Sequence, residues 1–201
     1  MIKKMKDYDS VTSFGQSEFK TLKPGGYICR ILKAEEMTSS SGKQMLHIAF
    51  DICEGDNIDF FNDLFKARKK ANTNPLKTIK WPFEGQAWIP INDYEDPNKT
   101  SRKFKGFCTA VEDSGTEIWD LDGNLDLDKL AQAEVGVVFQ DVEKEYNGKT
   151  SWRALPWGFR SIASIATGDY FVPEPKELPI TQNTGFESAD SFNAAEDDIP
   201  F

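Results

Sequence analysis

The stretch VGVVFQDVEKEYNGKTSWRALPW, residues 135–157, decides the fold of this chain. Two runs of β-forming residues, 135–146 and 149–157, flank the pair Asn147-Gly148. Asn-Gly suits a two-residue type I′ turn, because both positions of that turn need a positive φ that these residues tolerate. The sequence therefore predicts a β-hairpin late in the chain.

Three apolar runs upstream of this hairpin are separated by short turns rich in Pro, Gly, Ser and Asn. They are predicted as strands over residues 27–37, 44–53 and 58–65. In the second run, Leu46, Ile48, Phe50 and Ile52 alternate with other residues and define one apolar face. Strands joined by such short turns pair antiparallel, so the first half of the chain is also predicted to be β.

The apolar period changes in the middle of the chain. Phe104, Phe107, Cys108 and Val111 follow the helical spacing i, i+3, i+4, i+7, with Thr100 and Ser101 as candidate N-caps and Gly115 as a helix end. Short helices are also predicted over residues 127–133 and 161–166. Three strands, a helix and two strands is the order of an OB-fold, a five-stranded antiparallel barrel with its helix between strands three and four.

The chain is divided into three parts. Residues 1–23 are predicted to be an N-terminal arm, residues 24–172 an OB-like domain, and residues 173–201 a disordered tail. Within the domain, residues 66–99 are interpreted as a basic insertion. The tail is rich in Pro, Glu, Asn, Ser and Asp, and this composition does not offset the entropy cost of ordering.

Charge is distributed unevenly along the 201 residues. The net charge is −9, and the seven acids and one lysine from Pro173 onward contribute −6 of it. The remaining body is close to neutral, and its bases are clustered. Three scattered cysteines favour a reducing compartment over a disulfide framework. With no apolar run of membrane-spanning length and no signal segment, the sequence predicts a cytoplasmic protein.

Two spans without a single acid, residues 64–83 and 98–110, interleave cations with aromatic rings. Single-stranded nucleic acid is bound by cations that follow the phosphates and by rings on which bases stack. Trp152 alternates with Ser151 and Arg153 on its strand, so it either stacks on DNA or packs in the core. The predicted DNA-binding residues are Lys66, Arg68, Lys69, Lys70, Lys77, Lys80, Trp81, Trp88, Arg102, Lys103, Tyr146, Lys149, Trp152 and Arg153.

Signals for metal binding and catalysis are weak. The single histidine, His47, lies in a predicted strand and is not expected to bind a metal. Residues 120–126 faintly resemble a calcium loop. Their glycine is not at the position that an EF-hand requires, and no Glu closes the loop, so an acidic turn is expected. Without a phosphate loop, a nucleophile motif or the spaced acids of a nuclease, we expect a non-enzymatic protein without a cofactor.

The last five residues are Asp197-Asp198-Ile199-Pro200-Phe201. A large ring beside a carboxylate, preceded by two aspartates, suits a partner that offers an apolar pocket with Arg or Lys at its rim. The sequence therefore predicts a partner-docking tip.

This tip is similar to the C-terminal tip of bacterial single-stranded-DNA-binding proteins. The body resembles a family of phage proteins thought to bind single-stranded DNA. The segments that carry the resemblance are Pro24-Gly25-Gly26-Tyr27, Gly42-Lys43-Gln44-Met45-Leu46, Phe104-Lys105-Gly106-Phe107, Ala110-Val111-Glu112, Val135-Gly136-Val137-Val138-Phe139 and Trp157-Gly158-Phe159-Arg160-Ser161. The resemblance implies that Asp197 and Asp198 make acidic contacts and that Ile199, Pro200 and Phe201 dock as a wedge.

We therefore expect single-stranded DNA binding without sequence preference, in the replication, recombination or repair of phage DNA in the host bacterial cytoplasm. The tail is expected to recruit partner enzymes and to compete with DNA for the basic groove. The alternatives are a strand-annealing recombination protein, a small phage nuclease or nuclease accessory factor, and an acidic mimic of DNA. The sequence leaves open whether the protein forms a homo-oligomer.

Overall fold

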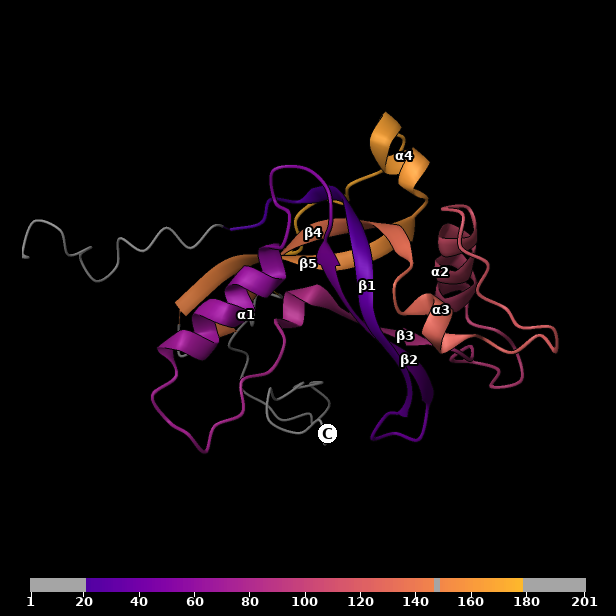
Figure 1. Ribbon diagram of the computed structural model, residues 1–201, viewed down its shortest axis with the longest axis horizontal. Coiled ribbons are helices and arrows are strands. Elements are labelled where there is room, and N and C mark those ends of the chain that lie inside the picture. Colours follow the sequence, from indigo (N-terminus) through magenta and orange to yellow (C-terminus); the bar gives the residue numbers. More distant parts are fainter. Residues whose placement is uncertain (1–20, 147–148, 179–201) are drawn as a thin grey trace, which may run out of the picture.

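The computed structural model describes residues 21–146 and 149–178 of the chain (Figure 1). Its strands are β1 (Gly25–Thr38), β2 (Gln44–Ile52), β3 (Gln86–Pro90), β4 (Glu134–Tyr146) and β5 (Lys149–Arg160). Its helices are α1 (Phe60–Ala71), the 3-10 turn η1 (Phe83–Gly85), α2 (Arg102–Glu112), α3 (Leu127–Leu130) and α4 (Ile162–Thr167). The described part of the protein is thus mainly β.

The five strands form one antiparallel sheet in the order β3-β2-β1-β4-β5. The central strand β1 pairs with β2 along most of its length and with β4 through its first residues. In Figure 1, β4 and β5 run across β1 and β2, so the sheet is strongly twisted. Its edges, β3 and β5, are not paired with each other, and the sheet is not closed. This arrangement is consistent with an OB-like fold.

Most elements predicted from the sequence are confirmed. The strands over 27–37 and 44–53 are β1 and β2, and the late hairpin is β4 and β5. The helix predicted from Phe104, Phe107, Cys108 and Val111 is α2, and all four side chains are buried. Its N-cap is Ser101, whose hydroxyl accepts a hydrogen bond from the backbone N–H of Lys103 at 3.1 Å.

The predicted third strand is wrong. Residues 60–71 form α1, and the third strand of the sheet is β3, which lies inside the range that was interpreted as an insertion. Phe61, Leu64 and Phe65 are spaced i, i+3, i+4, and the helix-forming run that follows continues the helix to Ala71. The segment between β2 and β3 is therefore packed on the sheet through α1.

Helix α1 is attached to the sheet at its first turn. Asp51 on β2 is buried, and its carboxylate accepts hydrogen bonds from the backbone N–H groups of Phe61 and Asn62, both at 2.9 Å. Free N–H groups at a helix start need such acceptors. Phe60 and Phe61 enter the core beside them. The helix is thus fixed at one end, and its other end is exposed.

The core lies on one face of the sheet. Phe50 of β2, Phe61 of α1 and Phe139 of β4 form a triangle of rings with centroids 6.0–6.2 Å apart. Phe107 of α2 packs edge to face on Phe159 of β5 at 4.8 Å. In Figure 1, α1 and α2 lie toward opposite ends of the sheet, and both contribute side chains to this core. The opposite face of β2 and β3 is left for other contacts.

Helix α4 packs where the sheet carries two glycines. A Cβ on Gly26 of β1 would lie 2.6 Å from the Tyr170 ring and 2.7 Å from Ile165. A Cβ on Gly136 of β4 would overlap Ile165 and approach the carbonyl oxygen of Arg160 to 2.9 Å. Ile165 therefore packs into a depression that exists because Gly26 and Gly136 have no side chains.

The predicted boundary of the disordered tail at Pro173 is too early. Lys176 forms a parallel bridge with Val142 of β4, and its backbone N–H donates to the carbonyl oxygen of Asp141 at 2.8 Å. Its carbonyl oxygen accepts from the N–H of Glu143 at 2.9 Å. Residues 173–178 thus follow the edge of β4, on the part of that strand that β1 does not cover.

Several predictions lie outside the described residues: most of the N-terminal arm, the Asn147-Gly148 turn, and the tail from residue 179 with its docking tip. Among the helices that the structure does describe, none is long and apolar enough to cross a membrane.

Candidate nucleic-acid interface

The basic residues 66–70 lie in the exposed second half of α1. Its cations project where the helix ends, and Lys/Arg side chains are favourable there because the helix dipole is negative at that end. This dipole contact is also an ordinary structural role for a lysine. The predicted DNA-binding residues on α1 are Lys66, Arg68, Lys69 and Lys70.

Two of the predicted cations are joined by one acid, Glu84 of η1. Its carboxylate accepts a hydrogen bond from Arg153 of β5 at 3.2 Å and lies 4.0 Å from the guanidinium of Arg68. The Glu84 side chain is mostly buried and both arginines are about half exposed. The three residues connect α1, η1 and β5 across the open side of the sheet, so part of the arginine charge is neutralised.

Trp81 is held against the protein. Its ring packs on Phe65 of α1 with centroids 5.5 Å apart, and its indole N–H is buried over Gly85. Little of this ring is left for a base. Lys77 and Lys80 lie in the exposed or half-exposed segment between α1 and Trp81.

The remaining predicted residues are spread over two regions. Arg102 and Lys103 are exposed on the first turn of α2. Trp152 is 43% exposed on β5, opposite Glu143 of β4. Tyr146 is the last residue of β4 and Lys149 the first of β5. The side chains of these two residues are not among those that the structure describes. The structure thus groups the α1 cations with Arg153 and leaves the α2 cations elsewhere.

A row of three rings lies on the face of β2 and β3 opposite the core, which we call the outer face. His47 of β2 is the cross-strand neighbour of Trp88 of β3, and their rings stack at 4.9 Å with an angle of 19°. Phe83 of η1 stacks on Trp88 at 5.2 Å with an angle of 26°. His47 is 5% exposed, whereas Phe83 is 48% exposed. The row therefore ends in a ring that solvent reaches.

A second aromatic–cation pair lies beyond the other end of β2. Lys43 precedes β2, and its ammonium nitrogen sits 3.6 Å from the centre of the Tyr94 ring. Tyr94 is 64% exposed. Residues alternate along a strand, so Lys43, Met45 and His47 belong to one face. The outer face thus carries rings toward both ends, separated by about 13 Å of strand β2.

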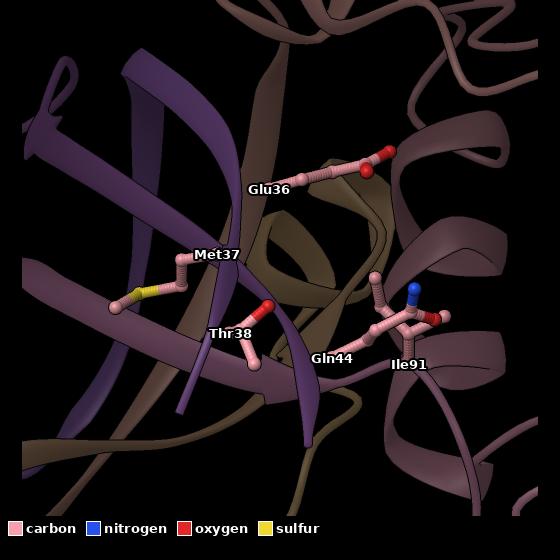
Figure 2. A pocket seen from close by; sticks show the side chains of 5 residues that line it. All are labelled: Glu36, Met37, Thr38, Gln44 and Ile91. Atoms are coloured by element: carbon pink, nitrogen blue, oxygen red, sulfur yellow. The ribbon is translucent and has the colours of Figure 1, made fainter. Parts of the chain in front are cut away.

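A hollow of about 210 Å³ lies between the end of β1, the start of β2 and the chain that leaves β3. Figure 2 shows Glu36 and Met37 pointing to opposite sides of β1, with Gln44 and Ile91 close together. The backbone N–H of Ile91 donates to the carbonyl oxygen of Gln44 at 3.1 Å. The hollow holds no cluster of charged groups that would identify a ligand.

His47 is hydrogen-bonded on both sides. Its Nδ1 lies 2.8 Å from a carboxylate oxygen of Glu35 on β1, and its Nε2 lies 2.8 Å from the side-chain carbonyl oxygen of Gln86 on β3. Lys33 contacts the other carboxylate oxygen of Glu35 at 2.7 Å. Hydrogen bonds from Lys33 and then from His47 lower the pKa of Glu35. This network connects the three strands of the outer face.

The other polar groups serve the fold. Asp120 accepts hydrogen bonds from the backbone N–H groups of Asp122 and Asn124, so residues 120–126 close on themselves as a turn. Within residues 21–146 and 149–178, no group of three or more His, Cys, Asp and Glu side chains is placed to hold a metal ion. Burial raises the pKa of Cys53 and Cys108 to about 11, and it also raises the pKa of Cys29 well above its ordinary value.

The sequence predictions named Trp88 but missed its stacking partners Phe83 and His47. They also missed the Lys43–Tyr94 pair at the other end of β2. With β3 placed at residues 86–90, alternation puts Gln86 and Trp88 on one face and Ala87 and Ile89 on the other. Phe83 and Tyr94 then flank the strand. Assigning the third strand to residues 58–65 removed this signal.

No protein-family model matches the chain, and comparison with curated proteins gives no match.

Proposed function

We propose that the protein binds single-stranded DNA without sequence preference on the outer face of β2 and β3, in an OB-like arrangement. OB-folds bind oligonucleotides on the face of their second and third strands and on the adjoining loops. In this chain, that face is the one that carries Phe83, Trp88 and His47.

The observation that carries the proposal is the stacked row of rings with an exposed end. Phe83 is 48% exposed while it stacks on Trp88, so one end of the row is accessible to a base. The exposed ring of Phe83, held in place by Trp88, offers a flat surface on which any base stacks, with about 1–3 kcal/mol for each base. Tyr94, with Lys43 over its ring, offers a second such surface.

Cations near the two ends of the face support a path for phosphates. Phe83 belongs to η1, which Glu84 connects to α1 and its cluster of lysines. Toward the other end, the chain from Tyr94 leads into α2 with Arg102 and Lys103, and the N–H of Ser101 donates to the carbonyl oxygen of Ile91 at 2.8 Å. A strand that lies on the rings would have basic side chains near each end.

The proposal is tested by titrating the full-length protein into labelled oligothymidylate, a mixed-sequence single strand and a duplex, and by following fluorescence anisotropy. Both single strands are expected to bind with similar affinity and the duplex more weakly. The logarithm of the association constant should fall with the logarithm of salt, by about 0.7 for each phosphate neutralised.

Absence of single-strand binding at low salt would contradict the proposal and would favour the acidic mimic of DNA. Faster renaturation of complementary strands in the presence of the protein would point to strand annealing instead. Magnesium-dependent loss of the labelled strand would point to a nuclease.

We further propose, from the sequence alone, that the terminal Asp-Asp-Ile-Pro-Phe recruits replication, repair or recombination enzymes. The last residue whose backbone the structure describes, Leu178, donates its N–H to Glu143 of β4 at 3.1 Å. The tail therefore starts beside the β4–β5 hairpin. A pull-down in which Phe201→Ala retains every partner of the wild type would contradict recruitment by the tip.

A further inference from the structure

The side-chain amide of Gln86 has only one orientation that fits its neighbours. Its Nε2 lies 3.0 Å from the carbonyl oxygen of Trp81 and 3.2 Å from that of Pro82. Carbonyl oxygens only accept hydrogen bonds, so the NH₂ group must face them and the amide oxygen must face His47. Gln86 therefore presents an acceptor to Nε2 of the ring.

The opposite side of the ring also faces an acceptor. Glu35 is a carboxylate, and the hydrogen bonds from Lys33 and His47 hold its pKa below the ordinary value. With acceptors 2.8 Å from both ring nitrogens, both must carry a proton. Only the imidazolium form has two N–H groups, so the geometry is that of a charged His47.

A neutral ring would break one of the two hydrogen bonds. A single N–H stays on the side of the carboxylate, because hydrogen bonds to a charged acceptor are the stronger ones. The lone pair of Nε2 would then face the amide oxygen of Gln86, which repels it. Gln86 would have to move, and it is the side chain that holds Trp81 and Pro82 directly before Phe83.

The charge also acts directly on the rings. His47 stacks on Trp88, and Phe83 stacks on the same indole. A cation over an indole is stabilised by the negative face of the ring. Loss of the proton therefore weakens the row twice, through Gln86 and through the stacking contact.

We propose that His47 is a positioning residue whose imidazolium form holds Phe83 and Trp88 in place for single-stranded DNA, so that affinity falls as this ring loses its proton. The inference rests on the proposed function of the outer face. His47 does not need to touch DNA itself, because it is covered by the sheet and by Trp88.

The charged groups around the ring are few. On β1 they are Glu35 and, through it, Lys33. From β3 the ring meets only the uncharged Gln86 and Trp88. On η1, Glu84 is engaged with Arg68 and Arg153, and on β2 itself Asp51 is engaged with α1. Glu35 is thus the charged group in direct contact with the His47 ring.

The test measures affinity for oligothymidylate at about pH 6 and about pH 8, a range in which histidine is the side chain that ordinarily titrates. His47 is the only histidine in the chain. Wild-type affinity is expected to fall roughly three- to tenfold over this range, as expected from losing a contact of this type. Equal affinity at the two pH values would overturn the inference and leave the proposed function intact.

Two variants separate this role from general electrostatics. Glu35→Gln supplies an amide N–H to Nδ1, so that a neutral ring can donate from Nε2 to Gln86. Its affinity should therefore be the same at both pH values. It should lie between the wild-type affinities at acidic and basic pH, because the Gln86 hydrogen bond is kept and the stacking contribution of the charge is lost. His47→Asn should be weak at both. A wild-type pH dependence that persists in His47→Asn would overturn the inference, because another group would then be responsible.

The ring can also be observed without DNA. With a single histidine, the ¹⁵N resonances of the imidazole report both nitrogens directly, and they should show two N–H groups at about pH 6. A single N–H under these conditions would overturn the inference. If no single strand binds at either pH, the proposed function fails, and this inference about affinity fails with it.

Discussion

At the scale of single residues, three acids hold elements together. Glu35 joins β1 to His47, Asp51 joins β2 to the start of α1, and Glu84 joins η1 to α1 and β5. Each of them meets hydrogen-bond donors or cations from another element. These three acids thus have a positioning role that net charge alone does not convey.

Asp51 allows the most direct stability prediction. Asp51→Ala leaves the N–H groups of Phe61 and Asn62 without their acceptor, and a buried donor without a partner costs about 1–3 kcal/mol. The free energy of unfolding in urea should fall by that amount. Asp63→Ala, an exposed acid in the first turn of the same helix, is the control and should change it by less than about 1 kcal/mol. Equal losses in both variants would contradict the anchoring role.

Asp51 also gives the stability of the protein a pH dependence of defined sign. Burial raises the pKa of Asp51, although the backbone N–H groups of Phe61, Asn62 and Ile52 lower it. Because the native pKa is raised, the protonation equilibrium of Asp51 makes a separate contribution to stability, which is complete below the unfolded pKa and is lost as pH rises through the native pKa. The hydrogen bonds from Phe61 and Asn62 do not depend on this loss, because the carboxylate still accepts them. The wild type should show this loss, and Asp51→Ala should lack it.

At the scale of elements, sequence patterns were sufficient to predict a strand or helix where one of its faces is apolar and where caps or turn residues mark its ends. Strands β1 and β2, helix α2 and the β4–β5 hairpin follow from alternation, caps and turn residues. Helix α1 did not, because a short apolar run such as 58–65 fits a strand as well as a helix. Strand β3 is only five residues long and is not preceded by a recognisable two-residue turn. It is therefore identified only by its pairing with β2.

The candidate site was predictable only in part for the same reason. Trp88 was identified as an aromatic among cations, but its partners come from β2 and η1 and meet it only in three dimensions. The salt bridges of Arg68 and Arg153 with Glu84 also depend on long-range contact. Composition located the basic segments, and the fold decided which of them were already engaged.

The packing of α4 gives a prediction at this scale. Gly136→Ala places a methyl group where Ile165 sits, and overpacking of this kind costs about 1–3 kcal/mol or displaces α4. Thermal unfolding should show a lower midpoint. The matched control is Gly106→Ala on α2, where nothing lies within 4 Å of the new Cβ and where alanine is favoured in a helix by about 1 kcal/mol. A neutral Gly136→Ala would show that α4 is not seated at this depression.

At the scale of the whole molecule, the described chain is an open antiparallel sheet with its core on one face and a row of rings on the other. The open side between β3 and β5 is bridged by Glu84 and its two arginines, and residues 173–178 extend along β4. The tail therefore starts next to the hairpin rather than at a distant end. The proposed function depends on the outer face and on the α1 cations, which η1 connects to it through Glu84.

The most direct test of the central claim compares three alanine variants in single-strand binding at one pH and one salt concentration. Trp88→Ala and Phe83→Ala remove rings of the outer face, and Phe171→Ala removes a ring that is 64% exposed elsewhere, against Trp157. Phe83→Ala removes the exposed stacking surface, and Trp88→Ala removes the ring that supports Phe83. Both are expected to weaken binding about tenfold or more, as expected for losing one stacked base, and Phe171→Ala should leave it unchanged. Wild-type affinity in Trp88→Ala and Phe83→Ala would contradict the claim that the outer face binds DNA.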